Sequence, residues 1–385
     1  MLLDRRDIMR NLAFCGVSAW LSRSHWAAAS DVKRFGLIAF STNGLTVSEY
    51  KLSQTMLADA GQLSGYERLD PIRVADIPAP IRTPLVPGAD ETTVASTADI
   101  IASRVDVLLA RGISRSDIIV LVSSGLDAFA GQLVAKLGDM LRLRTGVDLH
   151  LLSAREQGRL QFDWVVPPRL RGQVFQLEIG GGNSRGGFFD HPGRAGRYFD
   201  VSVPFGTKTL AAAVKARWPD VRTFDFPARA AEYYADAVFT SLASRPQEIA
   251  ATLKMPDVVL TGNIVRAAAV ILYPHEIVAN RRWIDFSPDA FARMRSFVEA
   301  GTPYGIVPDD LTQTQRASLL KIRSTIRSIF NPHQIAAGAA LADGLSRQLM
   351  FASRRKIRYP IGASNGWTSQ YLLENFKKGR RDRTG

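Results

Sequence analysis

The sequence predicts an α/β protein built from two similar domains that face a central cleft. Segments typical of strands and of helices alternate along the 385 residues, which is the pattern of sheets covered by helices. A strand, a glycine-containing turn and a second strand occur twice, at 35–53 and at 174–190. The length allows two or three domains, and a hydrophobic content of 46% is typical of a globular chain with a sizeable core.

The first 29 residues are expected to be an export signal rather than part of the fold. Arg5 and Arg6 precede a modest apolar run, and three small residues end at Ala29. This order is typical of a twin-arginine signal peptide, and an uncleaved amphipathic leader is the alternative. Export predicts a periplasmic protein. Because Cys15 is the one cysteine and lies in the leader, the exported chain would hold no disulfide or cysteine–zinc site.

The first half of the chain predicts a hairpin followed by alternating helices and strands. Residues 67–95 are rich in Pro and Asp and are expected to be loop with short strands. Gly112 and Gly146 are expected to end two amphipathic helices. The predicted strands are 35–42, 45–53, 117–125 and 148–153, and the predicted helices are 96–112, 128–146 and 154–166.

The second half repeats this pattern and then becomes mainly helical. A strand, turn and strand are predicted around 174–190, followed by a strand near 198–205. The later predicted elements are helices at 207–217 and 228–253, a strand at 256–263, helices within 288–352, a strand at 357–362 and a helix at 367–376. The expected division is a signal at 1–29, domain I at 30–165, domain II at 166–356, a strand and helix at 357–376 that can pack back on domain I, and a basic tail at 377–385.

The net charge of +13 predicts an attraction to polyanions such as phosphate chains. Basic residues are concentrated at 354–358 and 377–383. A solvated, disordered tail is the expected structure of 377–385. Neither a nucleic-acid-binding motif nor, after the leader, an apolar run of about 20 residues is present, so no nucleic-acid specificity and no membrane span are expected.

Three consecutive glycines directly after a strand raise the main functional question. They lie in QLEIGGGNSRGGFF, residues 176–189. Such a run can form a tight hairpin whose backbone needs positive φ. It can equally form a loop whose bare N–H groups lie against a phosphate. The run alone does not decide between these two interpretations.

Several segments together resemble the Ppx/GppA phosphatase family, which contains exopolyphosphatases and guanosine pentaphosphate phosphohydrolases. QLEIGGGNSRGGFF resembles the family's phosphate loop xIDIGGGSTEL, and LLSAREQGRLQFDW resembles its ISGxEEARLxxxG helix. SVPFGTKTL and VVLTGNIVRAAA resemble the family's SLPLGAVRLT and GTGGTxRALA segments. The resemblance covers most of 35–376 and implies the fold of actin, hexokinase and Hsp70: duplicated actin-like ATPase (ribonuclease H-like) domains around an interdomain cleft.

The resemblance implies that phosphate is bound by residues of both domains. In the second domain the glycines and Asn183 would supply backbone donors, Ser184 a hydroxyl and Arg185 a cation. Lys208 would contact phosphate or remain a solvated lysine, and the turn at 261–263 would line a nucleotide or simply end a strand. The implied phosphate-binding residues are Thr42, Asn43, Ser123, Ser124, Gly180, Gly181, Gly182, Asn183, Ser184, Arg185 and Lys208, and the implied nucleotide turn is Thr261, Gly262 and Asn263.

Acidic positions of the family pattern are replaced in this chain. The position of the family's general base is Gln157, and an amide cannot accept a proton from water near neutral pH. Glu156 would have to replace it, although neighbouring helix positions point about 100° apart. Glu178 retains a carboxylate, whereas Arg185 stands where the family has Glu and Ala39 where the family has Asp.

These replacements predict weak or lost hydrolysis with retained binding of polyphosphate or another phosphorylated ligand. The alternative is an active, divergent exopolyphosphatase-like hydrolase, with catalysis by Glu156, Gln157 and Glu178. Mg²⁺ prefers carboxylate and phosphate oxygens, so at most a weak magnesium site at Glu178 is expected. The resemblance also allows a homodimer formed through the helices of 313–352.

Overall fold

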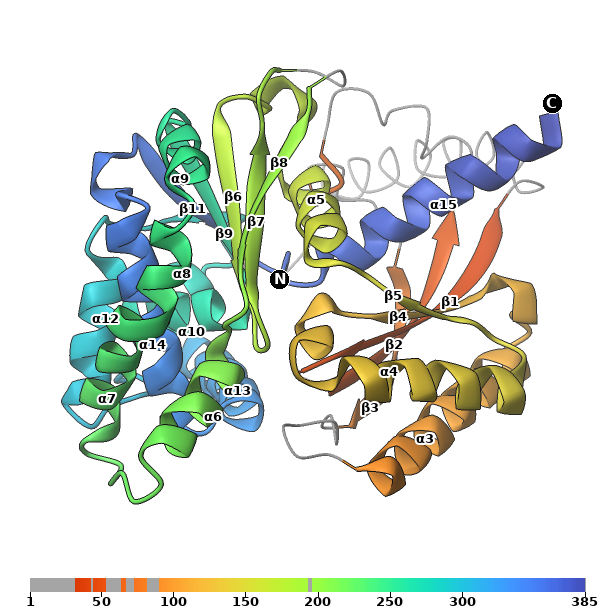
Figure 1. Ribbon diagram of the computed structural model, residues 1–385, viewed down its shortest axis with the longest axis horizontal. Helices are drawn as coiled ribbons and strands as arrows, with labels where there is room; N and C mark the ends of the chain where they lie inside the picture. The colour runs from red at the N-terminus through yellow and green to blue at the C-terminus, as the bar shows by residue number, and fades with distance from the viewer. Residues whose placement is uncertain are drawn as a thin grey trace, which may run out of the picture.

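The computed structural model describes residues 32–42, 44–52, 64–66, 73–81, 90–192 and 196–384, and Figure 1 shows two α/β halves that lie side by side. The predicted leader at 1–29 and the predicted phosphate-binding residue Asn43 lie outside the described residues. None of the helices in the described part of the chain is both long enough and apolar enough to cross a membrane.

The first half is built on a five-stranded sheet in the order β3-β2-β1-β4-β5. β1 pairs with β2 and β2 with β3 in antiparallel fashion, whereas β4 is parallel to β1 and β5 to β4. The predicted first hairpin is confirmed, with Ser41 paired to Gly44 at its tip. The strands are β1 (Lys33–Ser41), β2 (Gly44–Leu52), β3 (Arg73–Ile81), β4 (Ile118–Val122) and β5 (Leu149–Leu151).

The second half repeats this order in a six-stranded sheet, β10-β11-β9-β6-β7-β8. β6, β7 and β8 form an antiparallel meander, and β9 and β11 extend the sheet in parallel on the other side of β6. Only the antiparallel edge strand β10 has no counterpart in the first sheet. The repeated order confirms the predicted duplicated α/β fold. The strands are β6 (Val174–Ile179), β7 (Ser184–Phe189), β8 (Tyr198–Val203), β9 (Asp257–Thr261), β10 (Trp283–Asp285) and β11 (Lys356–Pro360).

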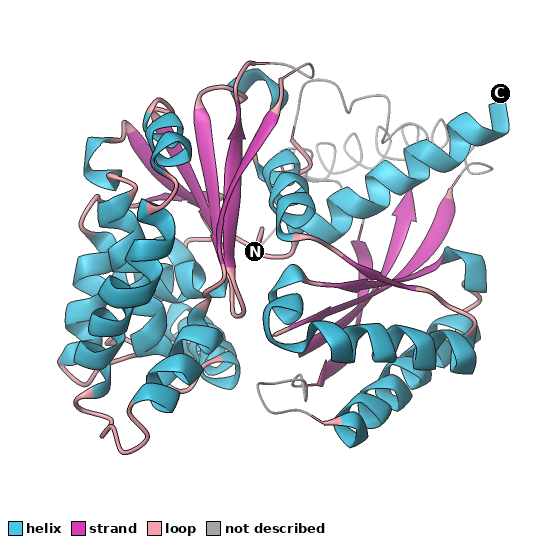
Figure 2. Cartoon of the chain, in the orientation of Figure 1, coloured by secondary structure: helices cyan, strands magenta, loops and turns pink. Residues whose placement is uncertain are grey.

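Helices cover both faces of the first sheet (Figure 2). α3 (Glu91–Ala110) and α4 (Ser124–Thr145) bury one apolar face against it, and α4 ends where Gly146 adopts a left-handed conformation. α5 (Ala154–Val165) and α15 (Gly366–Thr384) cover the other face. α5 also places Phe162 and Val165 against Val174 of the second sheet. It is therefore the element through which the two halves share a core.

The second half has a larger helical layer and the largest core. α14 (Pro332–Gln348) is central to it, with an almost entirely buried run from Ile335 to Ser346. The remaining helices are α6 (Thr207–Arg217), α7 (Phe226–Tyr233), the π-helical turn Tyr234–Val238, α8 (Phe239–Ala243), α9 (Pro246–Leu253), α10 (Asn263–Leu272), α11 (Pro274–Val278), α12 (Ala290–Glu299) and α13 (Gln313–Ile329).

The C-terminal segment divides between the two halves. β11 pairs with β9 and β10 and so belongs to the second sheet, whereas α15 packs on α5 and the first sheet. Arg159 of α5 forms a two-bond ion pair with Glu374 of α15, at 2.9 and 2.7 Å. α15 continues to Thr384, so residues 377–384 of the predicted basic tail belong to this helix. The short edge strand β10 was not predicted from the sequence.

Candidate functional site

The three glycines form the tip of the β6–β7 hairpin, where other backbone segments approach them closely. None of them has a positive φ, so the strained-turn interpretation is not supported. A Cβ on Gly182 would lie 2.1 Å from the carbonyl oxygen of Gly125, which belongs to the first half. A Cβ on Gly206 would lie 2.6 Å from the carbonyl oxygen of Gly180. Glycine is therefore needed here because three backbone segments meet without room for side chains.

The start of α6 holds this loop by its carbonyl groups. The N–H of Thr207 donates to the Gly180 oxygen at 2.9 Å, and the N–H of Lys208 donates to the Gly181 oxygen at 2.7 Å. The side chain of Lys208 reaches across to the first half, where Nζ donates to the Thr42 oxygen at 2.7 Å. The structure thus gives Lys208 the role of a bridge between the two halves at the tips of both hairpins.

Glu178 and Arg185 face each other on β6 and β7 and form a buried ion pair. They are directly opposite in the strand register, and Nη2 of Arg185 lies 2.8 Å from Oε1 of Glu178. The residues are only 5% and 3% exposed. Burial raises the pKa of Glu178, and the Arg185 charge opposes that rise. Nε of Arg185 and Oε2 of Glu178 have no hydrogen-bond partner among the described residues.

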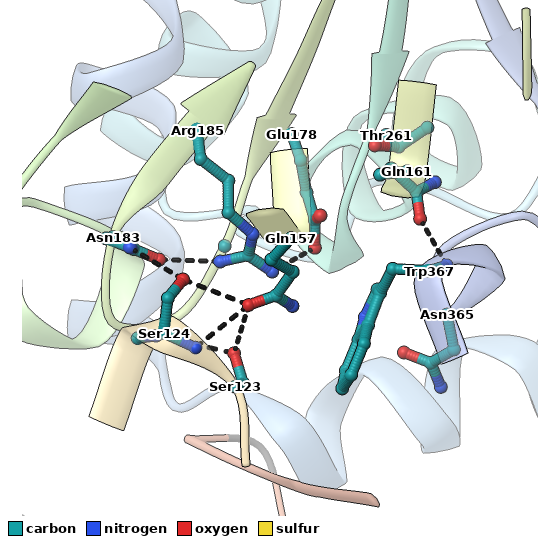
Figure 3. Close-up of polar contacts among 12 residues, drawn as sticks. Ser123, Ser124, Gln157, Gln161, Glu178, Asn183, Arg185, Thr261, Asn365 and Trp367 are labelled. Carbon is teal, nitrogen blue, oxygen red and sulfur yellow. Dashed lines mark hydrogen bonds and ion pairs between the residues drawn. The ribbon is translucent and has the colours of Figure 1, made fainter. Parts of the chain in front are cut away.

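Gln157, where the resemblance predicts a general base, is fixed by two serines at the start of α4. Its Oε1 accepts from the Ser124 N–H at 2.9 Å, from Ser124 Oγ at 2.9 Å and from Ser123 Oγ at 3.2 Å. Asn183 joins this network, because Nδ2 donates to Ser124 Oγ and Oδ1 accepts from Arg185. The amide nitrogen of Gln157 has no partner among the described residues. Figure 3 shows the network running between the two halves.

A second glutamine of α5 brings the C-terminal segment into the site. Gln161 is completely buried. Its Nε2 donates to the Ala363 oxygen at 2.8 Å and its Oε1 accepts from the Trp367 N–H at 2.9 Å. Trp367 and Asn365 therefore lie across the cavity from Gln157 (Figure 3). Sequence patterns did not predict these residues, because only the tertiary fold brings 364–367 to α5.

These groups line a partly open cavity between the two halves, which has about 30 Å³ of space accessible to water. That volume holds one or two water-sized groups. Most of the lining residues were predicted from the sequence. The lining residues of the C-terminal segment at 364–367 were not. The lining residues are Ser41, Thr42, Ser123, Gln157, Glu178, Gly180, Gly181, Gly182, Arg185, Gly262, Asn263, Ser364, Asn365 and Trp367.

Several predicted residues do not line this cavity. Glu156 is exposed and caps its own helix, with Oε2 accepting from the N–H and hydroxyl of Ser153. The Ser184 hydroxyl donates to the Phe205 oxygen at 2.9 Å, and the Thr261 hydroxyl accepts from Gln176 at 3.1 Å. The structure therefore does not place Glu156 where it could replace Gln157 as a base.

The cavity does not fit the magnesium ion that the fold family implies. No group of three or more His, Cys, Asp or Glu side chains in the described part of the chain could hold a metal ion. Glu178 is the one carboxylate in the cavity lining, and one of its oxygens is bound to Arg185. Mg²⁺ requires near-octahedral coordination by oxygen atoms. The carboxylate of Glu178 is paired with the Arg185 guanidinium, whose positive charge repels a second cation.

Solved structures of known proteins share this architecture. No family model matches the chain, and no curated protein matches it in sequence. The Ppx/GppA family member of Aquifex aeolicus is 13% identical with a TM-score of 0.55, and the match covers 90% of this chain and 99% of that one. An exopolyphosphatase of Cytophaga hutchinsonii is also 13% identical with a TM-score of 0.56, covering 89% and 98%. The chain therefore has the duplicated, actin-like α/β fold of the Ppx/GppA proteins, as the resemblance predicted.

Proposed function

We propose that the protein binds a phosphate group between its two halves and does not hydrolyse phosphoanhydrides. The observation that carries this proposal is the buried Glu178–Arg185 pair, in which Arg185 occupies a position where the resemblance implies an acidic group. Where the resemblance implies a cluster of carboxylates that holds a metal ion, this pair provides a fixed cation and one carboxylate, of which one oxygen is bound to that cation. The fold is that of exopolyphosphatases, which supports a phosphate compound as the ligand.

The residue at the position that the resemblance assigns to the general base argues against hydrolysis. The Gln157 oxygen already accepts three hydrogen bonds, and an amide does not take a proton from water. Glu156 points into its capping box instead of into the cavity. Loss of a general base typically lowers a rate about 10²–10⁴-fold, and the unsuitable metal environment adds to that loss.

Buried donors without partners argue for binding. Nε of Arg185 and Nε2 of Gln157 belong to residues that line the cavity, and neither has a hydrogen-bond partner among the described residues. Buried polar atoms are normally satisfied, and leaving one unpaired costs about 1–3 kcal/mol. A ligand group that accepts from these two nitrogens would remove that cost.

The experiment is a titration of the purified full chain with inorganic phosphate and with tripolyphosphate, followed by calorimetry. Phosphate release from tripolyphosphate is measured in parallel with and without Mg²⁺. We expect saturable binding and no release above a protein-free control. Mg²⁺-dependent release would instead support the divergent hydrolase, and the lack of any binding would show that the cavity groups serve packing alone.

A paired substitution keeps this test independent of folding. Glu178→Gln together with Arg185→Gln replaces the ion pair by two neutral side chains, which avoids an uncompensated buried charge. We expect this double variant to weaken phosphate binding about tenfold or more. The matched control is Arg355→Gln, which removes an arginine from an exposed pair with Asp257 outside the cavity lining.

We propose in addition that the chain is exported to the periplasm. The support is the order of Arg5, Arg6, an apolar run and Ala27–Ala29. Cell fractionation with and without Arg5→Lys and Arg6→Lys tests it. Export should stop in the double variant, and unchanged export would contradict a twin-arginine route.

A further inference from the structure

Tyr66 belongs to the first half of the molecule and contacts the second half. It lies in the segment 64–66, which is part of the connection between β2 and β3. Its hydroxyl donates to the carbonyl oxygen of Arg282, which directly precedes β10, and lies 3.0 Å from the oxygen of Ile361, which directly follows β11. Its ring packs edge-on against Trp283, with the ring centroids 5.2 Å apart. The side chain is therefore bound at the β10 edge of the second sheet.

Arg282 adds two contacts from the second half to the same residue. Its guanidinium donates to the Tyr66 carbonyl oxygen and also lies over the Tyr66 ring, 5.0 Å from the centroid. Burial raises the pKa of Tyr66 to about 12, so the hydroxyl keeps its proton and remains a donor near neutral pH. Hydrogen bonds and cation–π contacts of this kind are each worth about 0.5–1.5 kcal/mol. Together they make Tyr66 a stronger link between the halves than a single surface contact.

Tyr66 also binds next to both passages of the chain between the halves. The first passage follows α5 and leads to β6, and the second follows β11 and leads to α15. The Tyr66 N–H donates to the oxygen of Trp164, in the last turn of α5, at 2.8 Å. The oxygen of Ile361, which the hydroxyl approaches, belongs to the first residue of the second passage. Because a hinge rotation changes the backbone angles of such connecting residues, a residue that binds to both passages opposes the rotation.

The ring of Trp164 fills the space between two glycines and connects the segment 64–66 to the cavity. A Cβ on Gly65 would lie 2.1 Å from Cε3 of this ring, and a Cβ on Gly366 would lie 1.8 Å from its Cδ1. Glycine is therefore needed at both positions for the backbone to approach the ring. Gly366 directly precedes Trp367, which lines the cavity between the halves.

We propose that Tyr66 is a lock that holds the two halves in the closed arrangement, in which Gly182 meets Gly125. It binds the edge of the second sheet and both passages of the chain. Separation of the hairpin tips by rotation at the two passages would distort these contacts. The lock acts on the relative position of the halves, so it does not depend on which ligand the cavity binds.

Distances between spin labels on the two halves test the proposal by double electron–electron resonance. The labels are attached after Asp139→Cys on α4 and Lys215→Cys on α6, two exposed positions, in the full chain with Cys15→Ser. The unchanged protein should give one narrow distribution of distances. Tyr66→Phe keeps the ring and removes the hydroxyl, and the ratio of open to closed molecules should rise about tenfold. Tyr66→Ala, which also removes the ring contacts, should raise this ratio further.

Two further variants separate the lock from a general loss of packing. The matched control is Tyr304→Phe, which removes a hydroxyl bond to the Phe330 oxygen at 2.9 Å within the second half. It should leave the distances unchanged. Gly65→Ala leaves every group of Tyr66 in place but forces the segment away from the Trp164 ring, so it should also produce longer distances.

Unchanged distances in both Tyr66 variants would overturn the proposal, and so would equally longer distances in Tyr304→Phe. If Tyr66→Ala does not fold, the comparison of Tyr66→Phe and Gly65→Ala with Tyr304→Phe still decides. Phosphate binding is not part of this test, so its outcome leaves the proposed function standing.

Discussion

The two halves of the molecule each contain a buried carboxylate paired with arginine, and the two pairs differ in how complete they are. Glu49 of β2 binds Arg34 through Oε1 at 2.8 Å and Arg111 through Oε2 at 3.0 Å. Both arginines remain partly in contact with solvent, with side chains 39% and 45% exposed. Glu178 of β6 has one arginine, and that arginine is buried with it.

The difference separates a structural ion pair from a candidate binding site. Around Glu49 both carboxylate oxygens have donors, so the group needs nothing further. Around Glu178 one oxygen and one arginine nitrogen lack partners among the described residues, and both residues line the cavity between the halves. Because buried polar atoms are almost always satisfied, the incomplete pair is the one that a ligand would complete.

The largest expected effect is the loss of one partner from each pair. Arg185→Ala should lower the free energy of unfolding by about 3–5 kcal/mol, because the Glu178 charge is left buried and unpaired. Arg34→Ala should cost only about 1 kcal/mol, since Arg111 still binds Glu49 and the lost arginine is partly exposed. Urea denaturation of both variants measures this, and similar costs would break the comparison.

The next largest effect is expected at the contact between the two halves beside the cavity that Glu178 and Arg185 line. Gly182→Ala would place a methyl group 2.1 Å from the Gly125 oxygen. We expect a loss of about 1–3 kcal/mol, typical of overpacking, and a clear weakening of phosphate binding. Gly138→Ala in α4 is the control, because its nearest atom would be 3.8 Å away. It should stabilise the protein by about 0.5–1 kcal/mol. Unchanged phosphate binding in Gly182→Ala would show that the halves need not meet there.

A smaller effect is expected from the bridge between the two hairpin tips. Lys208→Met removes the bond from Nζ to the Thr42 oxygen, which is worth about 1 kcal/mol. Phosphate affinity should fall by a few-fold, since the second half then holds the first less firmly. Lys215→Met, on an exposed position of the same helix, should leave the affinity unchanged. Equal affinities for the two variants would assign Lys208 no part in closure.

The smallest effect is a difference in pH dependence. Hydrogen bonding from Arg34 lowers the pKa of Glu49 below 4.5, so the folded state binds fewer protons than the unfolded state near that pH. This contribution to stability is present above pH 4.5 and is lost as the pH falls through the lower folded value. Burial raises the pKa of Glu178, so its contribution decreases as the pH rises above 4.5. Stability measured against pH for Glu49→Gln and Glu178→Gln should differ from the unchanged protein in opposite directions, and shifts of the same sign would contradict this assignment.

Sequence patterns were sufficient for most of the elements and for much of the site. The two hairpins, the helix at 207–217 and the strand that ends near Thr261 follow from local alternation, helical periodicity and glycine placement. Glu178, Arg185 and Gln157 could be singled out because they lie in the two segments that resemble the phosphate loop and the helix of the Ppx/GppA family, and the structure places all three in the cavity lining. These predictions depend on residues that are close in the chain.

The α/β class, its duplication and the glycine hairpin follow from local patterns in the sequence. How these glycines are used and which segments close the cavity follow from the tertiary structure. Gly182 meets Gly125 of the other half, and Gln161 binds the backbone at 363–367, some 200 residues further along the chain. These contacts join residues that are far apart along the chain, and they form only when the layers of the fold pack together. The local periodicity of a sequence does not specify how those layers pack.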